Sequence, residues 1–213
     1  MKITKLGHSC LLVEEQSLRI LIDPGNYSTG QNELKNIDVL LITQEHQDHC
    51  DIGSIWSVLH NNPSVRVLTN DGTGAVLKKE KIRHDLVRRG ESMTVKGVLI
   101  EGYGKDHAEI YRTLPKVENT GYLIARRLYH PGDAFHNPGV RVEILALPVA
   151  GPWAKVSEAI DYAREVNPKI CFPIHDGMLR PDRTGSAHSL PAKVLEPYGI
   201  KFVILDEGKA VEV

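Results

Sequence analysis

The segment Thr43–His49 brings together side-chain types that bind metal ions. It reads Thr-Gln-Glu-His-Gln-Asp-His and follows the apolar run Ile37–Ile42, which predicts a buried strand. Its two imidazoles and one carboxylate, His46, Asp48 and His49, lie within four positions of one another. Imidazole and carboxylate groups are common ligands of Zn²⁺ in proteins. The sequence therefore predicts a metal site in this loop, in preference to a solvated turn.

Further potential ligands recur at or near the ends of other apolar runs. A metal ion needs several donors, and the edge of a sheet can gather side chains from distant parts of a chain. We therefore expect these residues to meet the loop at one sheet edge. They are His107 after the run Val98–Tyr103, Asp133 after Arg127–Tyr129, His175 after Ile170–Ile174, and His8 between the first two predicted strands.

The hydropathy pattern predicts an α/β chain in which strand-rich segments alternate with segments of strand and helix. Short β-branched and leucine-rich runs predict strands, and apolar residues at helical spacing predict amphipathic helices. This alternation suggests two sheets face to face with helices outside. Strands are expected at Ile3–Leu6, Cys10–Glu14, Leu18–Ile22, Ile37–Ile42, Val65–Thr69, Ser92–Val95, Val98–Tyr103, Gly121–Ala125, Arg127–Tyr129, Ile144–Leu147, Ile170–Ile174, Phe202–Leu205 and Ala210–Val213, and helices at Ile52–Leu59, Gly74–Ile82, Trp153–Val166 and from Leu190, capped by Ser189.

Length and composition predict one cytoplasmic domain. The chain of 213 residues can bury a substantial core, so we expect a single domain over residues 1–213. Its 26 Lys and Arg nearly balance its 27 Asp and Glu, which argues against a nucleic acid or another polyanionic partner. Three scattered cysteines indicate a reducing compartment. We expect no membrane partner, since no apolar run approaches the ~20 residues of a spanning helix.

The order and setting of these residues resemble the metallo-β-lactamase superfamily. Its signature is H-x-H-x-D-H after a strand, followed by a later His, an Asp and a final His. The small stand-alone hydrolases of the L-ascorbate-6-phosphate lactonase branch are similar in more segments, and the resemblance spans almost the whole chain. It implies a four-layer αββα sandwich with the metals at one edge, between the sheets. The segments that carry it are Leu6–Ser9, Leu21–Pro24, Asn119–Tyr122, His130–Asp133, Pro148–Trp153 and Ile174–Gly177.

The resemblance also implies a role for each predicted ligand. The expected cofactor is Zn²⁺, as one or two ions, with Mn²⁺ or Fe²⁺ as alternatives. Asp48 would be catalytic as well, because a carboxylate at one ion can hold the attacking water or relay its proton. In the implied assignment, His46 and His107 hold the first ion, Asp48, His49 and His175 hold the second, and Asp133 bridges the two.

Gln44 departs from the pattern of the superfamily. It stands where the first histidine of H-x-H-x-D-H is expected. A glutamine amide is a neutral oxygen donor, whereas Zn²⁺ favours imidazole and thiolate. Gln44 could make a long oxygen contact, a water could replace it, or only the second site could fill tightly. We expect a weakened first site, and an oxygen-richer shell would favour Mn²⁺ or Fe²⁺.

Three more side chains are candidates for orienting the ligands or touching the substrate. Asp23 ends the third predicted strand, His8 lies in a turn, and His188 follows a polar loop that could overhang a pocket. Metal sites need such orienting groups nearly as much as the ligands. A purely structural role is an equal alternative for His8, and a surface role is the favoured alternative for His188. Trp153 would either wall the pocket or anchor the following helix.

The function that the sequence predicts is metal-dependent hydrolysis. The metal would activate a water against a small soluble substrate with a lactone or phosphoester-type bond. The nearest alternative is a nuclease or phosphodiesterase of the same superfamily, which the near-neutral charge disfavours. A further alternative is a catalytically silent protein that binds a metal or metabolite, and Gln44 is the residue that supports it. The oligomeric state is left open.

Overall fold

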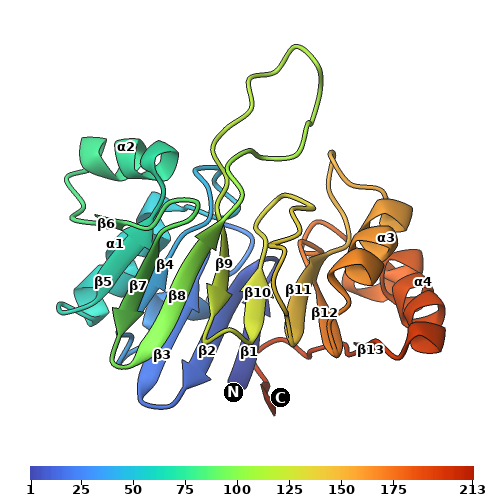
Figure 1. Ribbon diagram of the computed structural model, residues 1–213. Coiled ribbons are helices and arrows are strands. Elements are labelled where there is room, and N and C mark those ends of the chain that lie inside the picture. The colour runs from blue at the N-terminus through green and yellow to red at the C-terminus, as the bar shows by residue number, and fades with distance from the viewer.

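Two seven-stranded β-sheets lie face to face in the computed structural model, and helices cover their outer sides (Figure 1). The structure describes residues 1–213, apart from the side chain of residue 181. The first sheet contains β1 (Lys2–Gly7), β2 (Cys10–Glu15), β3 (Leu18–Ile22), β4 (Val39–Leu41), β5 (Arg66–Thr69), β6 (Asp85–Leu86) and β14 (Ala210–Glu212). The second contains β7 (Ser92–Val95), β8 (Val98–Tyr103), β9 (Gly121–Ile124), β10 (Leu128–His130), β11 (Ile144–Pro148), β12 (Ile170–Ile174) and β13 (Lys201–Phe202). The α-helices are α1 (Ile52–Asn61), α2 (Asp71–Lys79), α3 (Val156–Val166) and α4 (Gly185–Leu195).

Both sheets follow the same plan. The first has the order β14-β1-β2-β3-β4-β5-β6, antiparallel from β14 to β3 and parallel from β3 to β6. The second has the order β13-β12-β11-β10-β9-β8-β7, antiparallel from β7 to β10 and parallel from β10 to β13. Parallel neighbours need a crossover, and four of these crossovers contain an α-helix: α1 between β4 and β5, α2 between β5 and β6, α3 between β11 and β12, and α4 between β12 and β13. The parallel pairs β3–β4 and β10–β11 are joined without an α-helix. Such sheets place ligands beyond the carboxyl ends of their parallel strands.

Three apolar clusters hold the four layers together. In β2, Leu11 and Val13 join the cluster between the sheets, whereas Cys10 and Leu12 join the cluster beneath α1 and α2. The third cluster packs the second sheet against α3 and α4. Successive residues of a strand point to opposite faces, so a strand that is buried on both faces is apolar at every position. This accounts for the continuous apolar runs of the sequence.

The predicted αββα sandwich is confirmed, with local corrections. The helix predicted from Leu190 actually begins at Gly185, and Ser189 donates to the carbonyl of Gly185 (3.0 Å) instead of capping the helix. A serine inside a helix can satisfy its hydroxyl in this way, so it is an ambiguous start signal. β13 ends at Phe202, short of the predicted strand, and β6 is an additional strand. No α-helix in the described residues combines the length and apolar character needed to cross a bilayer.

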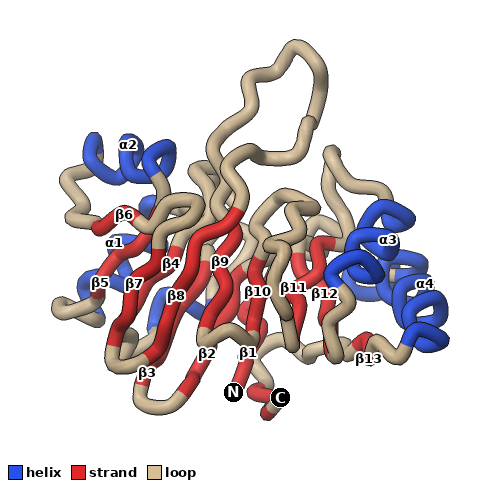
Figure 2. The backbone as a smooth tube through the Cα atoms, viewed as in Figure 1, coloured by secondary structure: helices blue, strands red, loops and turns tan.

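The segment between β8 and β9, residues 104–120, rises well above the sheet edge (Figure 2). Its base is closed by backbone hydrogen bonds from His107 to Val117 (3.1 Å) and from Asn119 to Lys105 (2.8 Å). Beyond that base the chain forms an extended coil. The loop thus holds His107 at its root and carries other side chains over the edge where the strands end.

Gly25 lies where a side chain would collide with the metal-ligand loop. A Cβ there would stand 1.8 Å from the backbone oxygen of Asp48. Backbone atoms cannot rotate away, so we expect Gly25→Ala to lower the free energy of unfolding by ~2 kcal/mol or more. Chemical denaturation followed by circular dichroism measures the change. Gly30→Ala is the matched control, because its Cβ would stand 3.5 Å from Cδ2 of Leu6. Equal stability of the two variants would contradict the expectation.

Candidate metal centre

The predicted ligands meet at one edge of the sandwich, where strands of both sheets end (Figure 1). Residues 43–49 follow β4 of the first sheet, whereas His107, Asp133 and His175 follow β8, β10 and β12 of the second. His8 lies in the tight turn between β1 and β2, with a φ of 47°. The direction of the strands therefore gathers donors that are far apart in sequence.

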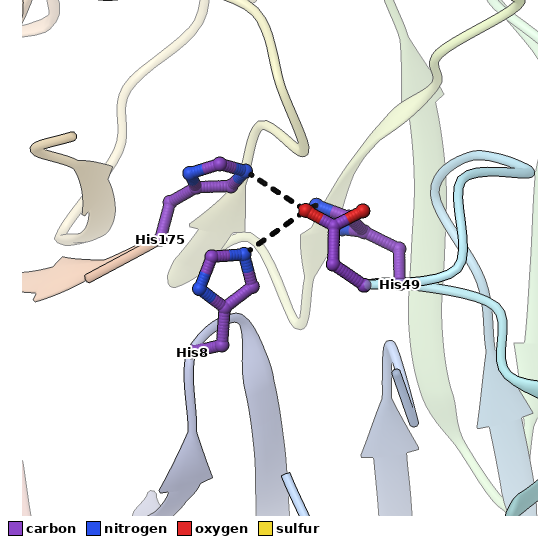
Figure 3. Close-up of side chains that lie close together, drawn as sticks. His8, His49 and His175 are labelled. Carbon is purple, nitrogen blue, oxygen red and sulfur yellow. Dashed lines mark hydrogen bonds and ion pairs between the residues drawn. The ribbon is translucent and has the colours of Figure 1, made fainter. Parts of the chain in front are cut away.

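Asp48 is the focus of one group of donors. His8, Asp48, His49 and His175 each offer an atom within 4.8 Å of the others. Oδ2 of Asp48 lies 3.2 Å from Nε2 of His8, 3.4 Å from Nε2 of His175 and 3.9 Å from Nε2 of His49. Figure 3 shows the rings of His8 and His175 directed at this carboxylate, with His49 behind it.

Asp133 joins this group to a second one. His46, His107 and Asp133 also offer atoms within 4.8 Å of one another. Oδ2 of Asp133 lies 3.2 Å from Nε2 of His107 and 2.9 Å from Nε2 of His175, and its Oδ1 lies 3.0 Å from Nε2 of His49. Asp133 thus contacts histidines of both groups, which is the position expected of a bridging carboxylate.

Three histidines are oriented from behind by oxygen acceptors. Each uses Nδ1 as the donor, so in the neutral ring Nε2 carries the lone pair that points to the centre. Such outer contacts fix the tautomer and ring orientation of metal-ligating histidines. The Nδ1 contacts are His49 to Oδ2 of Asp23 (2.8 Å), His107 to the carbonyl of Ala108 (2.5 Å) and His175 to the carbonyl of Ala150 (2.7 Å).

His8 has the opposite arrangement. The backbone N–H of Gly177 donates to Nδ1 of His8 (3.1 Å), so in the neutral ring the proton resides on Nε2. That Nε2–H points at Oδ2 of Asp48 (3.2 Å). His8 therefore donates a hydrogen bond to Asp48 and has no lone pair for a metal. This arrangement agrees with the orienting role predicted for His8.

The buried carboxylates and imidazoles shift one another's ionisation. Burial lowers the pKa of His175, but Asp133 overcomes this effect and raises that pKa to about 9. Burial likewise lowers the pKa of His49, yet Asp133 and Asp23 raise it well above its ordinary value. For Asp133, burial favours the neutral acid, but His49 and His175 hold its pKa well below the usual range. The centre thus stabilises positive charge beside its carboxylates, as a cation site must.

Several buried polar atoms at the centre have no hydrogen-bond partner among the described residues. They are Nε2 of His49, Nε2 of His175 and Oδ1 of Asp133. Both amide atoms of the buried Gln44, whose backbone pairs with Asn119, also lack a partner. His49 and Asp133 approach to 3.0 Å, but their alignment is not that of a hydrogen bond. Unpaired buried polar atoms are costly and rare. Converging lone pairs of this kind are satisfied by a metal ion, so the residues fit one.

Other residues hold the ligands in place but do not themselves offer an atom to a metal ion. Asp23 is fully buried and accepts from Oγ1 of Thr43 (2.7 Å) as well as from His49, so it orients a ligand and does not reach the substrate cavity. Asn119 accepts the backbone N–H of Asp133 (2.9 Å). Nε1 of Trp153 donates to Oδ2 of Asp133 (3.2 Å), which favours the pocket-wall role for this residue. The sequence segment Asn119–Tyr122 hinted at a role for Asn119 but not at this contact.

The structure does not bring His188 to the metal ligands. Its Nε2 lies 2.8 Å from Oδ2 of Asp176, the residue after His175. The other oxygen of Asp176 pairs with the buried ammonium of Lys5 (2.5 Å). His188 therefore ties α4 to the loop that carries His175. Lys5 gave no signal in the sequence, because a single lysine in a strand normally faces solvent.

A cavity of about 260 Å³ opens directly onto the donors. His46, Asp48, His107, Asp133 and His175 line it, and His49 lies behind them, fully buried. The side chain of Asp48 is 21% exposed, against 3% for Asp133. Asp48 is therefore the carboxylate that a molecule in the cavity would meet.

Comparison with known proteins identifies the family. The family model described as a β-lactamase superfamily domain matches residues 2–175. The chain belongs to the metallo-β-lactamase superfamily. This assignment confirms the superfamily predicted from the histidine loop, while the narrower likeness to the L-ascorbate-6-phosphate lactonase branch stays a prediction.

Relatives of this superfamily member extend over nearly the whole chain. A Mycobacterium tuberculosis protein is 36% identical over 216 residues, covering 99% of each chain. A metal-dependent hydrolase of Thermoplasma acidophilum is 24% identical over 189 residues, covering 82% of this chain and 83% of its own. Among solved structures, a metallo hydrolase from the archaeon Ignicoccus hospitalis superposes with a TM-score of 0.79 at 22% identity, covering 99% and 97%. These relatives agree with the prediction of a metal-dependent hydrolase.

Asp23 provides a test of the orienting contacts. Replacement by Asn removes the carboxylate that accepts from Nδ1 of His49, while the side chain keeps its size. We expect Asp23→Asn to weaken metal affinity by roughly 10- to 100-fold. Competition against a chromophoric zinc chelator measures the affinity. Asp206→Asn, which changes an exposed carboxylate paired with Lys209, is the control. Unchanged affinity in Asp23→Asn would show that His49 does not depend on this contact.

Proposed function

We propose that the chain is a metal-dependent hydrolase that attacks a small soluble substrate with water at two unequal metal sites. The observation that carries the proposal is the convergence of two donor groups on Asp133 beneath a cavity. His46, His107 and Asp133 would hold one ion. Asp48, His49 and His175, with Asp133, would hold the other.

The chain's own residues prepare the reaction around these ions. A bound divalent cation supplies Lewis acidity, lowering the pKa of its water from ~15.7 toward ~7 and polarising the substrate oxygen. Burial favours the neutral acid of Asp48, but the neighbouring imidazoles of His175 and His8 lower its pKa and keep it ionised. An ionised carboxylate that faces the cavity can accept a hydrogen bond from the attacking water and hold it in place. His8 holds Asp48 in that orientation.

Gln44 makes the two sites unequal. Its side chain is fully buried, and its backbone pairs with Asn119, which holds Asp133. The backbone of Gln44 is therefore linked through Asn119 to Asp133, which belongs to the group with His46 and His107. An amide oxygen binds Zn²⁺ more weakly than an imidazole does, so the first site would bind its ion less tightly. Zn²⁺ fits the second site, with two imidazoles and two carboxylates, and the first would accept Mn²⁺ or Fe²⁺ more readily because of the amide oxygen of Gln44.

The cavity favours a small molecule over a polymer. Its volume of about 260 Å³ lies below the ~300–1,000 Å³ of typical ligand pockets. The residues described as lining it include no Lys or Arg to follow a phosphate backbone, which argues against the nuclease alternative. A lactone, another ester or a single phosphoester remains as the scissile bond.

Gln44→His tests the inequality of the sites. Wild-type protein, loaded with Zn²⁺ and freed of excess by gel filtration, is expected to retain about one ion per chain. The variant is expected to retain about two, because a second imidazole completes the first site. Inductively coupled plasma mass spectrometry measures the content, and hydrolysis of aryl ester and aryl phosphate substrates is assayed in parallel.

Gln16→His adds the same side chain at an exposed turn and is the control for nonspecific metal uptake. Two tightly held ions in the wild type would refute unequal sites. A Gln44→His variant that gains neither metal nor hydrolysis, from a wild type without activity, would instead support a silent metal- or metabolite-binding protein.

A further inference from the structure

Apolar side chains from separate loops line the mouth of the cavity, together with the exposed residues Asn26 and Gln47. Tyr27, Ile110 and Met178 are 51%, 37% and 44% exposed and line the cavity together with Pro152 and Trp153. Ile110 is carried by the loop that rises above the sheets, and Met178 follows β12 (Figure 1). Large exposed apolar groups that converge on one opening mark a binding surface.

The same lining lacks groups that recognise anions. Apart from the proposed metal ligands, its polar members are the neutral amides of Asn26 and Gln47, and the phenol of Tyr27. Proteins usually recognise phosphate with Arg or Lys side chains. The lining of this cavity contains neither, and Lys116 belongs to a smaller adjoining hollow that shares His46, His107 and Ile110 with it. Within the cavity itself, an anionic substrate would find positive charge only at the ions.

The arginines of the neighbouring loop are already engaged elsewhere. Nε of Arg180 lies 3.0 Å from Asp182, and Nε of Arg183 lies 3.9 Å from the same carboxylate. Both guanidinium side chains are largely exposed and stand outside the cavity lining. In the loop between β8 and β9, Arg112 lies 5.9 Å from the centre of the Tyr111 ring and is not among the residues that line the cavity. These cations do not convert the cavity into an anion site.

We infer that the substrate is an uncharged ester or lactone with an apolar arm that lies across Tyr27, Ile110 and Met178, and not a phosphoester. The inference rests on the proposed function and narrows its substrate class. In the reaction the acyl carbon–oxygen bond breaks and a bond forms between that carbon and the water oxygen. One water proton passes to the leaving alkoxide, and the acid product releases the other. No further reactant is needed.

A series of p-nitrophenyl esters tests the chain-length preference. Zn²⁺-loaded protein is assayed with acyl groups from acetyl to octanoyl, and with p-nitrophenyl phosphate and bis(p-nitrophenyl) phosphate, which share the leaving group. A fully buried methylene strengthens binding about fourfold, so even partial burial should raise kcat/KM at least about tenfold from acetyl to octanoyl. Most of the change should appear in KM. Both phosphates should be hydrolysed far more slowly than the octanoyl ester.

Two variants test whether the chain-length preference depends on the apolar side chains at the mouth of the cavity. Ile110→Ser and Met178→Ser should each reduce the octanoyl-to-acetyl ratio of kcat/KM about threefold or more, since each removes apolar contact area. Ile204→Ser is the matched control, because Ile204 is 57% exposed and lies outside the cavity lining. Its ratio should equal that of the wild type. A ratio that does not depend on Ile110 or Met178 overturns the inference.

Equilibrium binding of non-hydrolysable compounds distinguishes a failure of the proposed apolar arm from a failure of the proposed hydrolase activity. Acetohydroxamate and octanohydroxamate, which bind zinc but contain no ester, are titrated into the Zn²⁺-loaded protein by calorimetry. Tighter binding of the octanoyl compound without hydrolysis of any ester would support the apolar arm and contradict the hydrolase. Ester hydrolysis without a chain-length effect, or faster hydrolysis of either phosphate, would leave the hydrolase standing and overturn the inference.

Discussion

The buried carboxylate of Asp133 is the group on which the rest of the site depends. A carboxylate removed from water is stable only if positive charge and hydrogen bonds compensate for the lost hydration. His107 and His175 supply this from the second sheet, and His49 supplies it from the first. Because these histidines come from both sheets, their contacts with Asp133 connect the two sheets at this edge. The demand for positive charge also explains why imidazoles crowd around Asp133 and why a cation fits between them.

The contacts behind the ligands give this arrangement its geometry. Asp23 and two backbone carbonyls accept from the Nδ1 atoms of the ligating histidines, whereas the N–H of Gly177 donates to His8. The direction of the hydrogen bond at Nδ1 therefore distinguishes the ligating histidines, which donate there, from His8, which accepts there and orients Asp48. This difference arises because His175 and Gly177 lie on one short loop, so that the loop both supplies a ligand and positions His8 against Asp48. Groups fixed in this way by surrounding contacts are preorganised for chemistry.

The sequence predicts the sandwich and the donors because both follow local rules. The periodicity of strands and helices is a property of each short segment, and the predicted donors follow strands in the folded chain as they follow apolar runs in the sequence. The role of His8 could not be derived locally, since it depends on Gly177, 169 residues away. The start of α4 was misplaced because Ser189 can bond within a helix as readily as it can cap one. The apolar mouth is equally nonlocal, because Ile110 and Met178 meet only when two irregular loops fold over the edge.

Charge balance connects Gln44 with the character of the cavity. The proposed ligands bring two negative charges, from Asp48 and Asp133, while the imidazoles and the amide of Gln44 bring none when neutral. One divalent cation balances these carboxylates, and a second leaves excess positive charge that an anion would offset. If one ion binds tightly, as proposed, the floor of the cavity would be nearly neutral beneath Tyr27, Ile110 and Met178. An uncharged substrate would suit that floor, whereas a phosphoester would require a further ion at the first site, which is the site that Gln44 is proposed to weaken.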